Sequence, residues 1–401
     1  MERREMKAQG APQCCCGCGG GVHKCDVAII GGGVHGCSTA YHLAKKGYKV
    51  ALFERDYISS GGSGRSAAGI RHQFGTEVNI RLAQYNMQVF KTLEKDLNYP
   101  VSLEYDPAGY LWIAYSESQL AQLEKNVAFQ NELGTTGSKV LTPAQIKEVA
   151  PHLNVEGMLG ASWNQEDGHI NPHTLCFAYA DSAKALGAEI HKHTPVTGIL
   201  MKGGRAAGVH TTKGDWEADS VVCCAGPWSV EVGKWLGLDV PITPERHQIL
   251  ITEAVERMKH PMTLCLDDGS YWKQCPNGTF MLGWGNPEEK KDTEYTSSWD
   301  FLDEVTTRVL AKMPVLGGIR LVRQWTGPYD NTPDFQAIVG ATPVPGFFLN
   351  CGWSGHGLQF GPSVGRILSE LVAGEKPYID VSMFRYSRFE EGDLFFETAC
   401  I

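Results

Sequence analysis

The sequence lacks any uninterrupted apolar run of about 18 residues, the length at which a helix can span a bilayer, so we expect no transmembrane segment. It also lacks a stripe of basic side chains, and its formal net charge of −9 argues against nucleic acid as a partner. The first residues contain no apolar core of the kind found in secretory signals. No internal repeat is visible in the 401 residues, whose length and 42% hydrophobic content indicate two lobes with a substantial core.

The cysteines lack the spacing of a disulfide framework. Of the 13 in the chain, Cys14, Cys15, Cys16, Cys18 and Cys25 gather near the N-terminus among glycines. Clustered thiolates can bind a metal or an iron–sulfur centre, but CCC-x-C fits no established ligand spacing. We therefore expect residues 1–24 to form a disordered tail and predict no metal site. Most other cysteines lie in apolar runs, which indicates buried, reduced thiols and a cytoplasmic location.

A glycine-rich turn follows the first apolar run, VAII. Gly31-x-Gly33-x-x-Gly36 begins a predicted helix that ends near Lys46, and the next apolar run ends on Glu54. This is the context of a dinucleotide-binding turn, in which the helix N-terminus faces a pyrophosphate and the acidic residue accepts from ribose hydroxyls. An ordinary turn between a strand and a helix is the alternative.

Two later segments favour FAD over a nicotinamide cofactor. A nicotinamide enzyme would continue with the next Rossmann strand, whereas residues 55–75 form a second loop rich in glycine and serine. Such a loop can run beside the pyrophosphate toward a ring. A later strand ends at Ala225-Gly226, where small residues allow close passage beside the same cofactor.

The remaining pattern predicts an α/β plus antiparallel β architecture. We expect a FAD-binding, Rossmann-like lobe of the glutathione-reductase type with an interleaved antiparallel-sheet substrate lobe. Helices are predicted over 76–97, 117–133, 171–188 and 297–313, and a strand pair around 107–109. The FAD-binding domain would comprise 25–90, 146–238 and 325–401, and the substrate domain 91–145 and 239–324. A ligand ring would lie where the two lobes meet.

A third glycine-rich loop, GWSGHGLQFGPS at 352–363, precedes an amphipathic helix. Glycine within an element costs roughly 0.5–1 kcal/mol relative to alanine, so such a loop usually permits close approach of the backbone to a ligand. The sequence pattern alone does not identify that ligand.

Together these segments resemble the D-amino-acid oxidase-type flavoproteins and, within them, the sarcosine oxidase group. The resemblance runs from about Asp26 to the C-terminus and is carried by GGGVHG, GIRHQFG, VVCCAGPWS, PERHQ, NTPD at 331–334 and CGWSGHGLQF. The branch that looks most similar contains the β subunits of heteromeric sarcosine oxidase and of dye-linked L-proline dehydrogenase. A mitochondrial complex I assembly flavoprotein looks similar too.

The resemblance implies where FAD would be held. In such enzymes the SGHG loop and the following helix N-terminus lie over the pyrimidine edge of the flavin, where N–H groups stabilise negative charge. Arg65 would contact the pyrophosphate. The implied cofactor-binding residues are Gly31, Gly33, Val34, His35, Gly36, Glu54, Arg55, Gly62, Ser63, Arg65, Ser66, Val196, Ala225, Gly226, Gly355, His356, Gly357, Leu358 and Gln359.

The resemblance also implies an arginine that binds a substrate carboxylate. In GIRHQFG this residue is Arg71, and a guanidinium suits the role because it can donate two parallel hydrogen bonds to a carboxylate. A structural role for this arginine is the alternative. The other candidate catalytic or pocket residues, for which core or loop packing is the alternative, are His72, Gln73, Tyr271, His356 and Gln359.

The chain departs from the monomeric sarcosine oxidases at several positions. Gln359 replaces a lysine that completes the carboxylate clamp, and Gly327 replaces the cysteine that attaches flavin, which implies noncovalent FAD. Met281 replaces a lysine that assists the reaction with O2, which favours a dehydrogenase. Heteromeric relatives attach FMN to a histidine whose match here is Pro172, one position from His173, so a noncovalent FMN at a subunit interface stays open.

The sequence is therefore interpreted as a FAD-dependent dehydrogenase that oxidises a small amino acid to an imine. The expected substrate carries a secondary amine, as in sarcosine, proline or another N-alkyl amino acid. Electrons would pass to partner subunits that carry FMN or iron–sulfur centres. The alternatives are an amino-acid oxidase that makes H2O2 and a noncatalytic, FAD-containing assembly factor.

Overall fold

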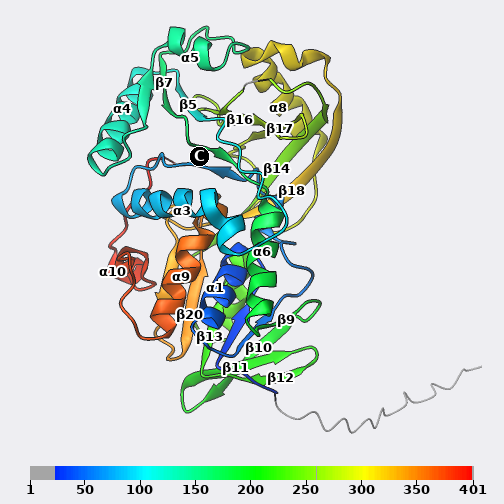
Figure 1. Ribbon diagram of the computed structural model, residues 1–401, viewed down its shortest axis with the longest axis vertical. Coiled ribbons are helices and arrows are strands. Elements are labelled where there is room, and N and C mark those ends of the chain that lie inside the picture. The colour runs from blue at the N-terminus through cyan, green and yellow to red at the C-terminus, as the bar shows by residue number, and fades with distance from the viewer. Residues whose placement is uncertain (1–22, 259, 400–401) are drawn as a thin grey trace, which may run out of the picture.

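The computed structural model describes residues 23–258 and 260–399. Within these residues the strands form sheets of six, eight, four and two strands (Figure 1). No helix in this part of the chain has the length and apolar content needed to cross a membrane. The cysteines at positions 14, 15, 16 and 18 lie outside the described residues.

The six-stranded sheet is the centre of the lower lobe in Figure 1. Its order is β19-β20-β13-β2-β3-β9, and every pair except β19–β20 is parallel. The central strands read as continuous apolar runs because both faces of the sheet are covered. The bounds are β2 (Val27–Ile30), β3 (Val50–Phe53), β9 (Glu189–His191), β13 (Ser220–Cys223), β19 (Ile338–Ala341) and β20 (Phe347–Cys351).

Helices cover one face of this sheet and a small sheet covers the other. The helices α1 (Val34–Lys45), α6 (Pro172–Ala185) and α9 (Gly361–Val372) lie side by side (Figure 1) and share one apolar core with the sheet. The second core lies beneath the four-stranded sheet, whose strands are β1 (His23–Lys24), β10 (Val196–Lys202), β11 (Arg205–Thr211) and β12 (Gly214–Glu217).

The upper lobe is built on the eight-stranded sheet, of order β18-β14-β17-β16-β15-β5-β7-β6. Its strand pairs are antiparallel except β15–β5. The strands are β5 (Tyr110–Ala114), β6 (Lys139–Leu141), β7 (Gly160–Asn164), β14 (Thr243–Ala254), β15 (Met262–Cys265), β16 (Ser270–Gln274), β17 (Thr279–Trp284) and β18 (Leu321–Asn331). The predicted fold class, a Rossmann-like lobe with an interleaved antiparallel-sheet lobe, is confirmed.

The predicted helices are present with ends within a few residues of the expected ones. Asn171 caps α6 and Thr142 caps α5 (Pro143–Val149) with their side chains, as their positions before a proline indicate. The remaining elements are α2 (Gly62–Arg65), β4 (Gly69–Ile70), α3 (Glu77–Asp96), α4 (Glu117–Glu132), α5 (Pro143–Val149), β8 (Gly168–His169), α7 (Ser229–Lys234), α8 (Trp299–Lys312), α10 (Arg388–Glu391) and the 3-10 turns η1 (Gly226–Trp228), η2 (Pro314–Gly318), η3 (Gly357–Phe360) and η4 (Ser382–Phe384).

Three sequence-based boundaries differ from the structure. The strand pair predicted around 107–109 is wrong: only β5 forms, because Pro107 has no N–H to donate and Gly109 turns the chain with φ of +88°. The predicted boundary at residue 146 is too early, since β7 pairs with β5 in the eight-stranded sheet. Of the predicted tail, His23 and Lys24 pair with β12.

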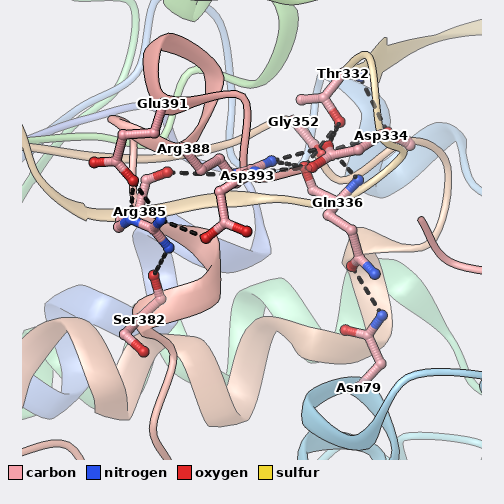
Figure 2. A network of polar contacts seen from close by, with 11 residues as sticks. Asn79, Thr332, Asp334, Gln336, Gly352, Ser382, Arg385, Arg388, Glu391 and Asp393 are labelled. Carbon is pink, nitrogen blue, oxygen red and sulfur yellow. Dashed lines mark hydrogen bonds and ion pairs between the residues drawn. The ribbon is translucent and has the colours of Figure 1, made fainter. Parts of the chain in front are cut away.

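A buried ion pair fastens the C-terminal segment to the lower lobe (Figure 2). Arg388 and Asp334 are both fully buried, with Nε–Oδ2 and Nη2–Oδ1 distances of 2.8 and 3.0 Å. Arg388 Nη2 also donates to the Gln336 carbonyl at 2.8 Å, and Thr332 Oγ1 donates to Asp334. Because each charge is desolvated, each needs the other to stay buried.

Removing one member of this pair should therefore be strongly destabilising. We expect Arg388→Met to lower the free energy of unfolding by about 3–5 kcal/mol, because Asp334 is left as an uncompensated buried charge. Denaturant unfolding measures this. The matched control is Arg385→Met, which breaks a solvent-exposed pair with Glu391 and should cost much less. Equal losses in the two variants would contradict the assignment.

Candidate functional site

A cavity opens at the carboxyl ends of the parallel strands and reaches the eight-stranded sheet. Gly31, Glu54 and Ala225, which follow β2, β3 and β13, line one part of it. His247 and Tyr271, on β14 and β16, line the other. Ligands of open α/β sheets bind at this edge, so we call this space the cofactor cavity.

Most of the predicted cofactor-binding residues line the cofactor cavity. They are Gly31, Gly33, Val34, His35, Glu54, Arg55, Gly62, Ser63, Arg65, Ser66, Val196, Ala225, Gly226, Gly355, Gly357 and Leu358. Gly36 does not line it; a Cβ there would overlap the Gly31 carbonyl, so its role is to let α1 approach the turn. His356 and Gln359 line a second, adjoining cavity instead.

Ser63 and Glu54 hold the turn at the start of α1. Val34 N donates to Ser63 Oγ at 3.1 Å, which brings the second glycine-rich loop against the helix N-terminus. Glu54 Oε2 accepts from Gly32 N at 2.7 Å and Oε1 accepts from Asp56 N at 2.8 Å. A carboxylate has further acceptor positions, so these bonds orient Glu54 without excluding the predicted ribose contact.

Two arginines bring positive charge to the same cavity. The Arg65 guanidinium lies 3.7 Å from the Tyr295 ring centroid, and its Nε and Nη1 donate to the Ser60 and Thr326 carbonyls. The Arg55 guanidinium lies 3.8 Å from the Trp228 ring centroid. Neutral carbonyls and an aromatic face orient Arg65, which leaves its charge available to a pyrophosphate, whereas Arg55 also pairs with Asp56, with Nε and Oδ2 3.3 Å apart.

Polar atoms left without partners show that a polar ligand fits this cavity. Both ring nitrogens of His35 and Nε2 of His247 are buried and have no hydrogen-bond partner among the described residues. Burial lowers the pKa of His35 to about 3 and that of His247 to about 4, so both rings are neutral. Because buried polar groups are normally paired, these residues fit a ligand such as FAD with many polar atoms.

The second cavity adjoins the first at Ser66, Ala67, Tyr271, Tyr329, Gly355 and Leu358, which line both. We call it the substrate cavity. Apolar and aromatic side chains from the eight-stranded sheet form one wall, and they are Tyr110, Trp112, Met262 and Leu264. Of the predicted catalytic residues, it brings together Arg71, Tyr271, His356 and Gln359.

Arg71 is the charged side chain of the substrate cavity and is only 6% exposed. Its guanidinium carbon lies 3.9 Å from the Phe74 ring centroid and 4.6 Å from that of Trp112. Nη2 donates to the Ala399 carbonyl at 2.7 Å, Nη1 donates to the Gln73 carbonyl, and the backbone N–H donates to Gln359 Oε1 at 2.8 Å. The arginine is thus held from its own loop, from the SGHG loop and from the C-terminal end.

His72 and Gln73 were expected in the pocket, but they lie behind it. The fully buried Asp167 accepts from the His72 N–H at 2.8 Å and from Gln73 Nε2 at 3.0 Å, and its Oδ1 lies 2.7 Å from His72 Nδ1. Gln73 Oε1 accepts from Ser162 Oγ at 2.6 Å. Asp167 and Ser162 thus hold these side chains outside the substrate cavity, so they position the loop.

The SGHG loop is pinned where the two cavities meet. Gly355 has φ of +88°, and a Cβ there would overlap the Tyr329 ring. Asp330 accepts from Gly352 N at 2.7 Å and Trp353 N at 3.1 Å, while burial raises its pKa to about 6. Sequence reasoning missed Tyr329 and Asp330, although the quoted NTPD stretch begins one residue later.

Fold and cavities together define a flavoprotein of the two-lobed, dinucleotide-binding class. The chain matches the family model described as FAD dependent oxidoreductase over residues 26–371, and it belongs to that family. The described residues contain no group of three or more His, Cys, Asp or Glu side chains placed to hold a metal ion.

The chain is similar to several characterised proteins. It is 30% identical over 381 residues to sarcosine oxidase subunit beta of Rhodobacter capsulatus, covering 93% of this chain and 90% of that protein. The crystal structure of L-proline dehydrogenase from P. horikoshii matches with a TM-score of 0.88 and 30% identity, over 93% of this chain and 100% of that one. The mitochondrial pyruvate dehydrogenase phosphatase regulatory subunit of Mus musculus is 29% identical over 90% of this chain, but the match spans 43% of that longer protein.

The Gly355 contact predicts a specific loss of flavin. We expect Gly355→Ala to lower the flavin-to-protein absorbance ratio, because the new methyl group must displace Tyr329 at the junction of the cavities. Gly374→Ala is the matched control: its φ of +73° imposes comparable backbone strain, but no atom lies within 4 Å of the added Cβ. Equal flavin loss in both variants would show that strain, rather than the loop's approach, is responsible.

Proposed function

We propose that this chain oxidises small amino acids with a secondary amine, and that Arg71 binds their carboxylate. The observation that carries the proposal is a buried guanidinium in a cavity that adjoins the cofactor cavity. A carboxylate entering the substrate cavity would meet one positive charge among apolar and aromatic walls. Arginine suits this role because its N–H groups match carboxylate geometry.

The relatives support this substrate class. Sarcosine and proline, named in two of them, are both small and both combine a carboxylate with a secondary amine. Bound FAD supplies the acceptor for the two electrons that such an oxidation releases. The protein residues bind and orient the substrate, while Trp112 and Met262 limit its size and exclude water.

Three titratable groups beside Arg71 in the substrate cavity are neutral. Burial, with the charge of Arg71 as a second cause, lowers the pKa of His356 to about 3. Burial raises the pKa of Tyr110 to about 12 and that of Tyr271 well above its usual value. These three groups therefore add no charge that competes with Arg71, and none is a strong base at neutral pH.

We further propose noncovalent FAD and an electron-accepting partner subunit. Gly327 lines the cofactor cavity and has no side chain to attach flavin. The similarity to a protein named as a β subunit supports a heteromeric enzyme, in which FMN or iron–sulfur centres on other subunits would receive the electrons.

Lys273 is the observation that favours the second candidate, an oxidase that makes H2O2. Lys273 lies directly opposite Met281 in the β16–β17 pair, and strand alternation puts it on the same face as Tyr271. Its side chain is buried, and burial lowers the pKa of its ammonium to about 8. The Lys273 ammonium on this face could replace the lysine absent at position 281. Neither Lys273 nor Met281 lines the two cavities.

Replacing Arg71 tests the carboxylate anchor. We expect Arg71→Ala to raise KM for sarcosine or proline about 10- to 150-fold, because a charge-assisted hydrogen bond of roughly 1.5–3 kcal/mol is lost. Flavin content should stay the same, and steady-state kinetics with an artificial dye measures the change. Arg81→Ala, which removes an exposed arginine paired with Glu77, is the matched control. An unchanged KM in Arg71→Ala would assign carboxylate binding to another group.

Oxygen reactivity separates the two candidate functions. For a dehydrogenase we expect the substrate-reduced protein to reoxidise slowly in air-saturated buffer, and Met281→Lys to accelerate it by placing an ammonium on the sheet face beside Tyr271. Thr279→Lys is the control, because it adds the same ammonium two residues from Met281 on the same face of β17, farther from Tyr271. Stopped-flow absorbance records both rates. Wild-type reoxidation as fast as reduction would establish the oxidase, and slowing by Lys273→Met would then identify its cation.

A further inference from the structure

The last described residues form a strap that reaches Arg71, a residue lining the substrate cavity. We define the C-terminal strap as residues 394–399. It follows α10, whose Arg388 is fixed to Asp334, and Arg385 holds the intervening turn through Glu391 and Asp393 (Figure 2). At its beginning, Phe395 packs on Phe384 with ring centroids 5.7 Å apart. The strap therefore begins at a segment that ion pairs and aromatic packing hold in place.

Glu397 fixes the other end of the strap to the start of α3. Its side chain is 4% exposed, and its two oxygens accept from Gly75 N at 2.6 Å, Thr76 Oγ1 at 2.9 Å and Asn79 Nδ2 at 2.8 Å. Thr76 is the N-cap residue of α3, and its hydroxyl donates to Glu397 instead of making a capping bond. Glu397 thus adds to the negative charge of Glu77 at the helix N-terminus, where such charge is favourable.

The close fit of the strap depends on Gly75. A Cβ at Gly75 would overlap Thr398 Oγ1 and approach Glu397 Oε1. The side chains of Glu397 and Thr398 can therefore lie directly on the turn that separates Arg71 from α3. Asn79 also links Glu397 to the polar network around Arg388 and Asp334. Its Nδ2 donates both to Glu397 and to Gln336 Oε1, the latter at 3.0 Å (Figure 2).

Beyond Glu397 the strap contacts the guanidinium itself. Glu397 Oε1 accepts from Ala399 N at 2.8 Å, and the Ala399 carbonyl accepts from Arg71 Nη2 at 2.7 Å. The Gln73 carbonyl accepts from Nη1. Two carbonyl acceptors at the two terminal nitrogens fix the plane of the guanidinium between the Phe74 and Trp112 rings.

We propose that Glu397 is a positioning residue, which acts through the Ala399 carbonyl to orient Arg71 for small carboxylates. The inference rests on the proposed function, because it takes Arg71 as the carboxylate anchor. It adds that the anchor is assembled from the C-terminal end of the described chain rather than from the cavity walls alone. Freeing the strap should then weaken binding of carboxylates and leave neutral ligands of the same shape unaffected.

Binding of two matched probes to the flavin-loaded protein tests the proposal. Propionate carries the charge that Arg71 recognises, and propionamide has the same shape without it. The dissociation constant of each is measured from the change in the flavin visible spectrum. We expect Glu397→Gln to raise Kd for propionate about 10-fold and to leave Kd for propionamide unchanged. With an amino-acid substrate, KM should rise while kcat stays within about twofold, since only the anchor is disturbed.

Two further variants separate positioning from general damage. Thr76→Val removes one donor to Glu397 at nearly constant volume, so it should shift Kd for propionate in the same direction by less. Glu390→Gln removes the same charge from an exposed position in α10 and should leave both dissociation constants unchanged. Unfolding temperatures of all variants confirm that the fold persists.

The outcomes are distinct. An unchanged Kd for propionate in Glu397→Gln, a tighter one, or an equal shift for propionamide would each overturn the positioning role; a tighter Kd would mean that the Ala399 carbonyl competes with the ligand. If Arg71→Ala also leaves Kd for propionate unchanged, the carboxylate anchor itself is wrong and the proposed function fails with it. If Arg71→Ala raises Kd for propionate and Glu397→Gln does not, only the positioning role of Glu397 is overturned and the proposed function stands.

Discussion

A nearly buried guanidinium must find acceptors and polarisable surfaces inside the protein, and the substrate cavity is arranged around that requirement. Arg71 meets it with carbonyls from Gln73 and Ala399 and with the faces of Phe74 and Trp112. These carbonyls and rings fix the orientation of the side chain. Asp167 serves the same loop one layer deeper, where it holds His72 and Gln73 and so sets the backbone from which Arg71 projects.

The two lobes contribute different groups to the cavities where they meet. The carboxyl ends of the parallel strands provide backbone N–H groups and glycine turns, which suit a pyrophosphate. The eight-stranded sheet provides aromatic and apolar side chains, which suit a ring and a small substrate. Tyr271 and Tyr329 line both cavities from the sheet, and Gly355 and Leu358 do so from the SGHG loop. Ligands in the two cavities would therefore share one set of walls.

Local patterns in the sequence predicted the parts of the structure that local physics decides. Gly31, Gly33 and Glu54 were found from a strand, a turn and a helix adjacent in the chain, and Asn171 was found from its place before a proline. Sheet membership was harder: nothing within Gly160–Asn164 shows that β5, rather than the parallel sheet, is its partner. The Ala399 contact was beyond sequence reasoning, because a backbone carbonyl 328 residues from Arg71 carries no side-chain signal. His72 and Gln73 were misplaced because a motif gives proximity but not side-chain direction.

The strand order of the six-stranded sheet has a consequence for how the protein is made. β13 lies between β2, from the beginning of the described chain, and β20, from near its end. During synthesis β2, β3 and β13 emerge before β20, so the sheet keeps an unpaired edge on β13 until residues 347–351 have left the ribosome. Such an edge is open to pairing with other chains, and contacts this distant in sequence form slowly. Between the synthesis of β13 and that of β20 the nascent protein therefore exposes a strand edge at which aggregation can begin.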